Sequence, residues 1–138
     1  MKVISNNKSN EFKERTDIEN ILETSFSIRA SGVVELFLCS GWNPYSYPCY
    51  YYNINETQIY FNVYQTLPED LDGKFKTEHL EKYKGYSNIL SQDEWRSFTV
   101  SFSDNVTVKL IDINLNRTLI QHKITENWKP MFMFMRSK

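Results

Sequence analysis

The residue types that most often carry out chemistry are scarce in this chain. It holds two cysteines, Cys39 and Cys49, and two histidines, His79 and His122. A metal site needs three or four converging ligands, and no group of His, Cys and Asp residues has ligand spacing. We therefore expect no bound metal, and we expect both imidazoles to lie at the surface or at the rim of the fold.

The two cysteines bracket nine residues, a spacing that a hairpin loop can bridge. As a nucleophile, either thiol would need a nearby histidine base and a group that orients it. Two alternatives remain, a pair of buried free thiols and a Cys39–Cys49 disulfide. We favour the disulfide, which would restrict the unfolded chain and imply an oxidising compartment.

Other catalytic arrangements are not favoured by the sequence. The adjacent carboxylates Asp93 and Glu94 would point to opposite faces in a strand, and in a turn such residues most often face water. The chain holds four glycines, and none stands in a phosphate-binding or dinucleotide-binding motif. We therefore expect no cofactor and a non-catalytic role.

The residues between the cysteines have a composition that is typical of binding loops. Trp42, Tyr45 and Tyr47 lie in a segment that Pro44 and Pro48 stiffen, because proline fixes φ. Rigid aromatic rings supply contact area at low entropic cost in the recognition of sugars and proteins. We predict that these three aromatic residues form a binding loop. The alternative is that Trp42 folds back over the core as a lid.

Composition and charge narrow the class of protein. A chain of 138 residues fits one domain with a real core. The net charge of -1 comes from 16 basic and 17 acidic residues that are well mixed, so we expect no nucleic-acid partner. No apolar run approaches the roughly 20 residues that span a membrane. The first ten residues lack the apolar core of a signal peptide, so the chain is either cytosolic or a secreted form whose signal was removed.

Four sequons for N-glycosylation favour the secreted alternative. Their acceptor residues are Asn7, Asn55, Asn105 and Asn116. Three of them lie beside predicted strand ends, where a glycan would be tolerated. Together with the expected disulfide, they indicate a secreted, extracellular protein.

Alternation of apolar and polar residues dominates the chain from residue 25 onward. In RSFTVSFS, residues 96–103, the side chains of Phe98, Val100 and Phe102 share one face. PMFMFM, residues 130–135, is continuously apolar and predicts a strand that is covered on both faces. About eight such segments, separated by turn residues, predict an all-β fold, a single antiparallel β-sandwich.

Two regions do not follow this pattern. Residues 1–24 form a polar N-terminal segment that we expect to be partly ordered, and residues 25–138 form the β-sandwich domain. Within the N-terminal segment, residues 10–23 predict either an amphipathic helical turn or extended chain. Residues 66–90 form a long charged connection, for which we expect a helical turn near Pro68–Leu71 and a partly solvated strand.

The segment NILSQDEWRSFTVSFSDNVTVKL, residues 88–110, resembles a motif of the family named for insect farnesoic acid O-methyltransferase. The motif runs ILS-x-x-E-[YW]-R-x-F-W-[IV]-S-[WF], and the matching positions are Ile89, Leu90, Ser91, Glu94, Trp95, Arg96, Phe98, Val100, Ser101 and Phe102. Residues 26–40 and 126–135 are similar to other segments of that family, so the likeness covers roughly residues 24–135. The chain lacks the family's Gly-Gly-Trp element after Tyr52.

The resemblance implies a small β-sandwich of the kind found in secreted animal proteins. The family name implies methyl transfer to farnesoic acid from S-adenosylmethionine, yet this sequence shows neither a parallel sheet nor a glycine loop for that cofactor. We expect a secreted, non-catalytic module that recognises a glycan, a lipid-like molecule or an extracellular protein through its end loops. The alternatives are an S-adenosylmethionine-dependent O-methyltransferase that acts on a farnesoic-acid-like sesquiterpenoid, and a structural domain of a larger extracellular protein.

Arg96 stands apart within the matching motif. On strict alternation it shares the inward face with Phe98, where an unpaired charge is costly. We predict that Arg96 lies at the strand edge or bonds Glu94, Asp93 or backbone carbonyls. The alternative is that Arg96 recognises an acidic ligand.

Overall fold

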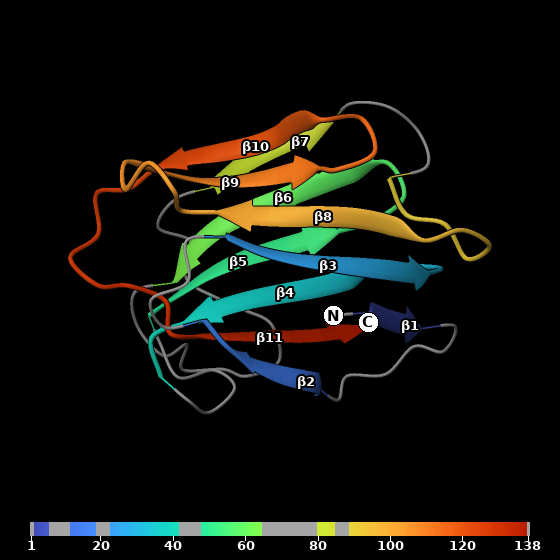
Figure 1. Ribbon diagram of the computed structural model, residues 1–138, viewed down its shortest axis with the longest axis horizontal. Coiled ribbons are helices and arrows are strands. Elements are labelled where there is room, and N and C mark those ends of the chain that lie inside the picture. The colour runs from blue at the N-terminus through green and yellow to red at the C-terminus, as the bar shows by residue number, and fades with distance from the viewer. Residues whose placement is uncertain are drawn as a thin grey trace.

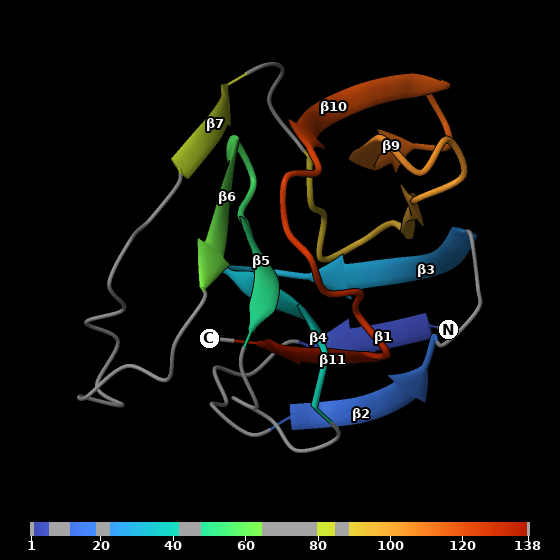
Figure 2. The same ribbon diagram turned by 90° about the vertical axis from the view of Figure 1, so that its left-hand side faces the viewer.

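The computed structural model describes residues 2–5, 12–18, 23–41, 48–64, 80–84 and 89–137. These residues form eleven strands that pack as two layers (Figures 1 and 2). The strands are β1 (Lys2–Ser5), β2 (Phe12–Asp17), β3 (Glu23–Ala30), β4 (Val34–Cys39), β5 (Cys49–Ile54), β6 (Gln58–Tyr64), β7 (Leu80–Lys84), β8 (Arg96–Ser101), β9 (Thr107–Asp112), β10 (Arg117–Lys123) and β11 (Phe132–Ser137).

Two sheets make up the sandwich. The first sheet has the order β1-β3-β8-β9-β10, and the second sheet has the order β2-β11-β4-β5-β6-β7. Eight of these strands form two antiparallel sheets of four, β3-β8-β9-β10 and β11-β4-β5-β6. The predicted all-β fold, an antiparallel β-sandwich of about eight strands, is confirmed.

Three further strands lie at the edges of these sheets. β1 pairs in parallel with β3, and β2 pairs antiparallel with β11. The described part of the N-terminal segment is therefore extended chain, the second of the two alternatives considered for residues 10–23. β7 lies in the long charged connection and pairs with β6. The helical turn expected near residues 68–71 lies outside the described residues.

The main core lies between the two sheets, and strand alternation explains its composition. Phe26 and Ile28 of β3 and Phe98 of β8 point inward and are buried. The rings of Phe26 and Phe98 stack with their centroids 5.7 Å apart, an arrangement that adds about 0.5–1.5 kcal/mol to the stabilisation from burial. Leu36 and Leu38 meet them from β4 in the second sheet.

The central strands of the second sheet are covered on both faces. Every residue of β4 is buried, as are all residues of β11 after Phe132. The strand predicted from PMFMFM, covered on both faces, is confirmed. The three consecutive tyrosines of β5 alternate as expected, because Tyr50 and Tyr52 enter the main core while Tyr51 enters a second cluster on the outer face.

One end of the sandwich brings together the segments that matter for the site. β4, β8 and β10 finish there and β5 begins there, on the left of Figure 1 and facing the viewer in Figure 2. We refer to it as the loop end. Residues 124–131, which connect β10 to β11, cross the loop end from one sheet to the other (Figure 2). At the top of both views, β7 and β10 lie side by side where the edges of the two sheets meet.

Candidate functional site

A disulfide bond closes the base of the predicted binding loop. Cys39, the last residue of β4, and Cys49, the first residue of β5, are register partners whose Cα atoms lie 4.1 Å apart. The backbone N–H of Ser40 donates to the carbonyl of Pro48 at 3.1 Å, so the hairpin pairing continues past the disulfide. The predicted disulfide is confirmed, and it holds the two ends of the loop together at the loop end.

The aromatic residues predicted to bind within this loop are Trp42, Tyr45 and Tyr47. All three lie outside the described residues, so their role as a binding surface stays a prediction. The structure describes where the loop leaves β4, at Gly41, and where it returns, at Pro48. Both of these positions are partly exposed.

An aromatic cluster packs around the disulfide on the outer face of the second sheet. It comprises Phe37, Cys39, Cys49, Tyr51, Tyr64 and Phe134, with Phe132 packed against it. The ring of Tyr51 lies 4.9 Å from that of Phe37 and 5.4 Å from that of Tyr64. Four neighbouring strands thus contribute side chains to the cluster, which gives the base of the loop a rigid support.

A buried ion pair lies on the same outer face. Arg136 Nε donates to Glu35 Oε1 at 2.7 Å, and the hydroxyl of Tyr51 donates to Glu35 Oε2 at 2.5 Å. The Arg136 guanidinium also lies over the Phe37 ring, 5.4 Å from its centroid. Burial and then the charge of Glu35 raise the pKa of Tyr51 well above its usual value, so the phenol keeps the proton that it donates.

Strand alternation explains the orientation of one half of this ion pair. Alternation along β4 places Glu35 on the outer face of the sheet, because Leu36 and Leu38 occupy the alternate positions and point into the core. Its partner Arg136 is 101 positions further along the chain. No local pattern could join the two residues, because only the pairing of β4 with β11 makes them register partners.

A second polar cluster lies inside the loop end and joins the two sheets. Oε1 of Glu126, in the connection between β10 and β11, accepts hydrogen bonds from the Tyr50 hydroxyl at 2.8 Å and pairs with His122 Nε2 at 2.9 Å. Thr125 Oγ1 donates to the other carboxylate oxygen at 2.9 Å. The ring of Trp128 packs on Tyr50 with centroids 4.5 Å apart. This cluster anchors the β10–β11 connection between the sheets.

The position of His122 differs from the prediction. A surface or rim imidazole was expected, but His122 is only 5% exposed and its ring lies 5.1 Å from that of Phe61. The prediction was wrong because alternation indicates only which face of β10 carries His122. The acidic partner that makes burial of the imidazole tolerable comes from a connection with no such pattern. His79 lies outside the described residues.

Electrostatics favour the ionised form of Glu126. Burial acts to raise the pKa of its carboxyl group, but hydrogen bonds from His122, Tyr50 and Thr125 outweigh this and lower the pKa below its usual value. For Tyr50, burial and the hydrogen bond to Glu126 raise the pKa well above the usual value. The cluster therefore consists of a carboxylate and a neutral phenol at physiological pH.

Arg96 pairs with a neighbouring carboxylate, as predicted. It is the first residue of β8, and its Nη1 lies 2.7 Å from Glu94 Oε2. The side chain of Glu94 is 67% exposed and that of Arg96 is 27% exposed, so solvent screens the pair. The hydroxyl of Ser91 accepts hydrogen bonds from the backbone N–H groups of Asp93 and Glu94, which shapes the turn before β8.

Three of the four sequon asparagines lie in turns between strands. Asn55 closes the β5–β6 turn, where its Oδ1 accepts hydrogen bonds from the backbone N–H groups of Thr57 and Gln58. Asn105 in the β8–β9 turn and Asn116 in the β9–β10 turn are exposed, with φ values of 58° and 50°. Asparagine tolerates this left-handed region better than most residues. Asn7 lies outside the described residues.

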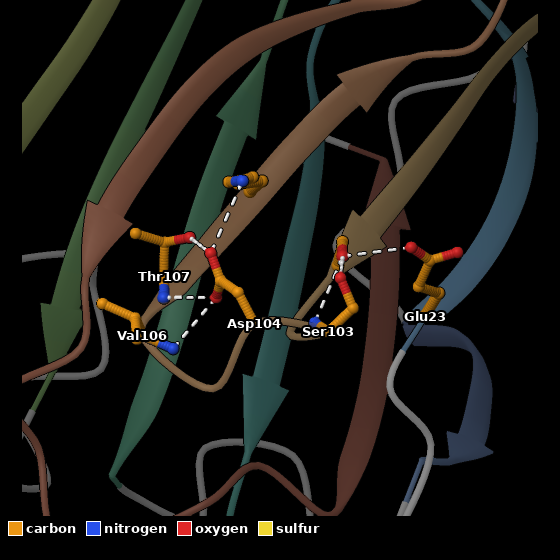
Figure 3. Close-up of polar contacts among 7 residues, drawn as sticks. Glu23, Ser103, Asp104, Val106 and Thr107 are labelled. Carbon is orange, nitrogen blue, oxygen red and sulfur yellow. Dashed lines mark hydrogen bonds and ion pairs between the residues drawn. The ribbon is translucent and has the colours of Figure 1, made fainter.

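The turn that holds Asn105 is organised by its neighbour Asp104. Oδ1 of Asp104 accepts hydrogen bonds from the backbone N–H groups of Val106 at 2.9 Å and Thr107 at 2.7 Å, and Oδ2 accepts one from the Thr107 hydroxyl at 2.6 Å (Figure 3). These hydrogen bonds, with the hydroxyl of Thr107 first among them, hold the pKa of Asp104 far below its usual value. Asp104 therefore stays ionised and keeps Asn105 exposed at the tip of the turn.

The part of the chain that the structure describes shows neither a metal centre nor a membrane-spanning helix. There, no three His, Cys, Asp and Glu side chains come together as metal ligands would. The described ranges also contain no helix of sufficient length and hydropathy to cross a membrane. No protein-family model matches the chain, and a search of curated proteins finds no match.

Proposed function

We propose that this chain is an extracellular, non-catalytic binding module that recognises its ligand through the loop closed by Cys39 and Cys49. One observation carries this proposal. The disulfide holds together the ends of a segment whose sequence contains Trp42, Tyr45 and Tyr47. The ligand is an extracellular glycan, a lipid-like molecule or a protein.

The physical support for a binding role is the rigidity of the loop base. A loop with fixed ends loses less conformational freedom when it binds, so more of its contact energy appears as affinity. The aromatic cluster around the disulfide fixes those ends from below, and the Glu35–Arg136 ion pair extends this support toward the opposite end of β4. Tyrosine and tryptophan side chains are well suited to such a surface because they lose few rotamers on binding.

We also propose that the chain is a divergent member of the family named for farnesoic acid O-methyltransferase. The β-sandwich and the ILS-x-x-E-W-R segment before and within β8 support it. Secretion and N-glycosylation are part of the same proposal, and the disulfide together with exposed Asn105 and Asn116 supports them.

The test is a binding screen of the whole chain with its disulfide intact. The probes are a printed glycan array, farnesoic acid and a library of displayed extracellular domains. A variant with Trp42→Ala, Tyr45→Ala and Tyr47→Ala should lose the binding that the native chain shows and should keep its melting temperature. Tyr60→Ala, which removes a half-buried aromatic side chain from β6, is the matched control and should bind normally.

Three results would overturn the proposal. If the triple variant binds as well as the native chain, the loop is not the recognition surface. If the native chain binds none of the probes, a purely structural domain is the better assignment. If isothermal titration with S-adenosylmethionine gives a clear heat of binding, the methyltransferase alternative replaces the binding module.

A further inference from the structure

The outer face of the first sheet carries a regular row of polar side chains along β3 and β8. Cross-strand partners in this row are Ser25 with Thr99 and Ser27 with Ser97. Their hydroxyl oxygens lie 2.8 Å and 2.7 Å apart. We call these four residues the hydroxyl strip. In Figure 1, β3 and β8 run side by side on the layer nearer to the viewer.

The hydroxyl strip has hydrogen-bonding capacity left over. A hydroxyl group has one proton and two lone pairs, so in each pair one group donates to the other and the second keeps its proton. Among the described contacts, the four hydroxyls make only these two hydrogen bonds. The strip therefore offers at least two donors and several lone pairs to solvent or to a ligand rich in hydroxyl groups.

An arginine without an acidic partner continues the row at one end. The Arg29 guanidinium lies over the Trp95 ring, 5.2 Å from its centroid. Its Nε is buried and makes no hydrogen bond, and in the described structure no carboxylate pairs with it. The two arginines Arg96 and Arg136 differ, because each has a glutamate at 2.7 Å.

A half-buried guanidinium without an anion is an unfavourable arrangement that a ligand can relieve. Partial burial weakens hydration of the charge, and the buried N–H lacks the partner that such groups normally have. Arginine stacked on an aromatic ring is held in one plane, which is the geometry for bidentate binding of a carboxylate or a sulfate. Trp95 thus positions Arg29 rather than neutralising it.

The opposite end of the row has the opposite charge. Glu23, the partner of Ser101 in the register of β3 and β8, accepts a hydrogen bond from the Ser101 hydroxyl at 3.2 Å (Figure 3). An acidic group would be repelled there and attracted at Arg29. From Ser25 to Arg29 the strand rises by about 14 Å, which is longer than a single sugar ring.

We propose that Arg29 and the hydroxyl strip form a binding site for a linear acidic glycan. Arg29 binds a carboxylate or sulfate group of the glycan, and Ser25, Ser27, Ser97 and Thr99 hydrogen-bond to hydroxyl groups of the neighbouring sugar rings. The site lies on a sheet face, apart from the loop closed by Cys39 and Cys49, and it shares with the proposed function only the extracellular location.

The experiment measures binding of three oligosaccharides to the whole oxidised chain by titration calorimetry. A heparin oligosaccharide carries sulfate groups, a hyaluronan oligosaccharide carries carboxylates alone, and a chitin oligosaccharide is neutral. We expect binding to at least one acidic probe, weakening as salt is added, and no binding to the neutral probe. The acidic probe that binds identifies the anionic group. The absence of binding to both acidic probes, or equal binding to the neutral one, would contradict the proposal.

Variants locate the site. Arg29→Ala should weaken binding about tenfold or more, and Arg29→Lys by less, because lysine keeps the charge but not the planar fork. Arg117→Ala is the matched control, since Arg117 is exposed at the start of β10, outside the strip, and its loss should leave the affinity unchanged. If Arg29→Ala and Arg117→Ala lose affinity equally, the glycan responds only to the net charge of the protein, and the proposed site is wrong.

A measurement on the native chain keeps the test independent of variant folding. Addition of the acidic probe should shift the amide NMR resonances of β3 and β8 more than those of β5 and β6. Shifts confined to the flanks of the 40–48 loop, or binding that is lost in the triple loop variant but kept in Arg29→Ala, would overturn this site and leave the proposed function standing. The reverse pattern would support this site even if the loop binds nothing.

Discussion

At the scale of single residues, Glu126 is the side chain that ties the two sheets together inside the loop end. Its carboxylate takes hydrogen bonds from Tyr50 of β5 in the second sheet and pairs with His122 of β10 in the first. Thr125 completes the set from the same connection. A buried carboxylate is tolerable only when it is fully hydrogen-bonded in this way, so loss of its charge should lower the stability of the fold.

Glu126→Gln should lower the free energy of unfolding by about 1–3 kcal/mol at neutral pH, because an amide cannot serve both donors as an acceptor of equal strength. The native pKa of Glu126 is lowered from its usual 4.5. A lowered pKa contributes stability above the unfolded-state value, and this stability is lost as the pH falls through the folded-state value. Urea unfolding at a series of pH values measures both effects.

In that series the native chain should lose more stability than the Gln variant between neutral pH and a pH below 4.5. Identical pH profiles for the two proteins would show that Glu126 is not ionised within the cluster. Thr125→Val serves as a control, since it removes one hydrogen bond to the carboxylate and leaves the charge in place.

Glu35 and Arg136 are a buried ion pair on the outer face of the second sheet, near the end of β4 that is opposite to the loop, with side chains that are 1% and 10% exposed. Removal of one partner leaves the other charge buried and unpaired. We expect Glu35→Met or Arg136→Met to cost about 3–5 kcal/mol of unfolding free energy, whereas the double variant should be much closer to the native value. A double-mutant cycle by chemical denaturation measures the coupling, and additive losses would contradict the pairing.

At the scale of elements, the β4–β5 hairpin is the unit on which the proposed recognition depends. Its two strands are in register from Val34 with Ile54 to Cys39 with Cys49, and the disulfide lies at the end where the loop connects them. Neighbouring strands β11 and β6 flank the hairpin on both sides. The strands therefore have support from their neighbours, while the residues between the cysteines depend on the disulfide.

Reduction of the Cys39–Cys49 disulfide, or replacement of both cysteines by serine, should lower the unfolding free energy by about 3 kcal/mol. The reason is that the open chain has more conformations when unfolded. The sandwich should still fold, because the pairing of β4 with β5 does not require the bond. Thermal unfolding under reducing and non-reducing conditions measures the change.

Intact mass provides the control for this experiment. The oxidised protein should weigh about two daltons less than the reduced one. Equal masses would show that the bond is not formed in the isolated protein. No difference in stability between the oxidised and reduced forms would contradict the physical account given above.

At the scale of the whole molecule, short strands lie at one edge of each sheet, β1 with four residues in the first sheet and β7 with five in the second. β1 and β2 lie at one edge of the two sheets, and β7 and β10 lie side by side at the other. Short or covered edge strands limit pairing with other chains. The turns that hold Asn105 and Asn116 lie outside the paired strands and are exposed, so a large group attached there would not disturb the sheets.

Expression through a secretory pathway should add N-glycans at Asn105 and Asn116, visible as mass that a glycosidase removes. Asn105→Gly and Asn116→Gly should each remove one glycan and leave stability nearly unchanged, because glycine accepts a φ near 50–60°. The matched Asn→Ala variants should also lose the glycan but cost about 1 kcal/mol. Unmodified native protein from the secretory pathway would contradict the proposed glycosylation.

The sequence by itself determined which face each strand residue occupies. Alternation placed Phe98 and Val100 in the core, separated Tyr51 from Tyr50 and Tyr52, and indicated that Glu35 points away from Leu36. These features follow from local geometry, because successive side chains of a strand point to opposite faces whatever the strand pairs with. The Cys39–Cys49 disulfide and the Arg96–Glu94 pair could also be predicted from the sequence, because the two residues of each pair are close in sequence.

Only the tertiary structure decided which residues from distant parts of the chain meet. The partners of Glu35 and Arg29, and the contact of Glu126 with Tyr50, come from strands or connections that no local pattern links to them. The parallel pairing of β1 with β3 is of the same kind. The physical reason is that the register and packing of distant strands are selected by the burial of the whole core, and a polar contact forms where that selection brings two side chains within hydrogen-bonding distance.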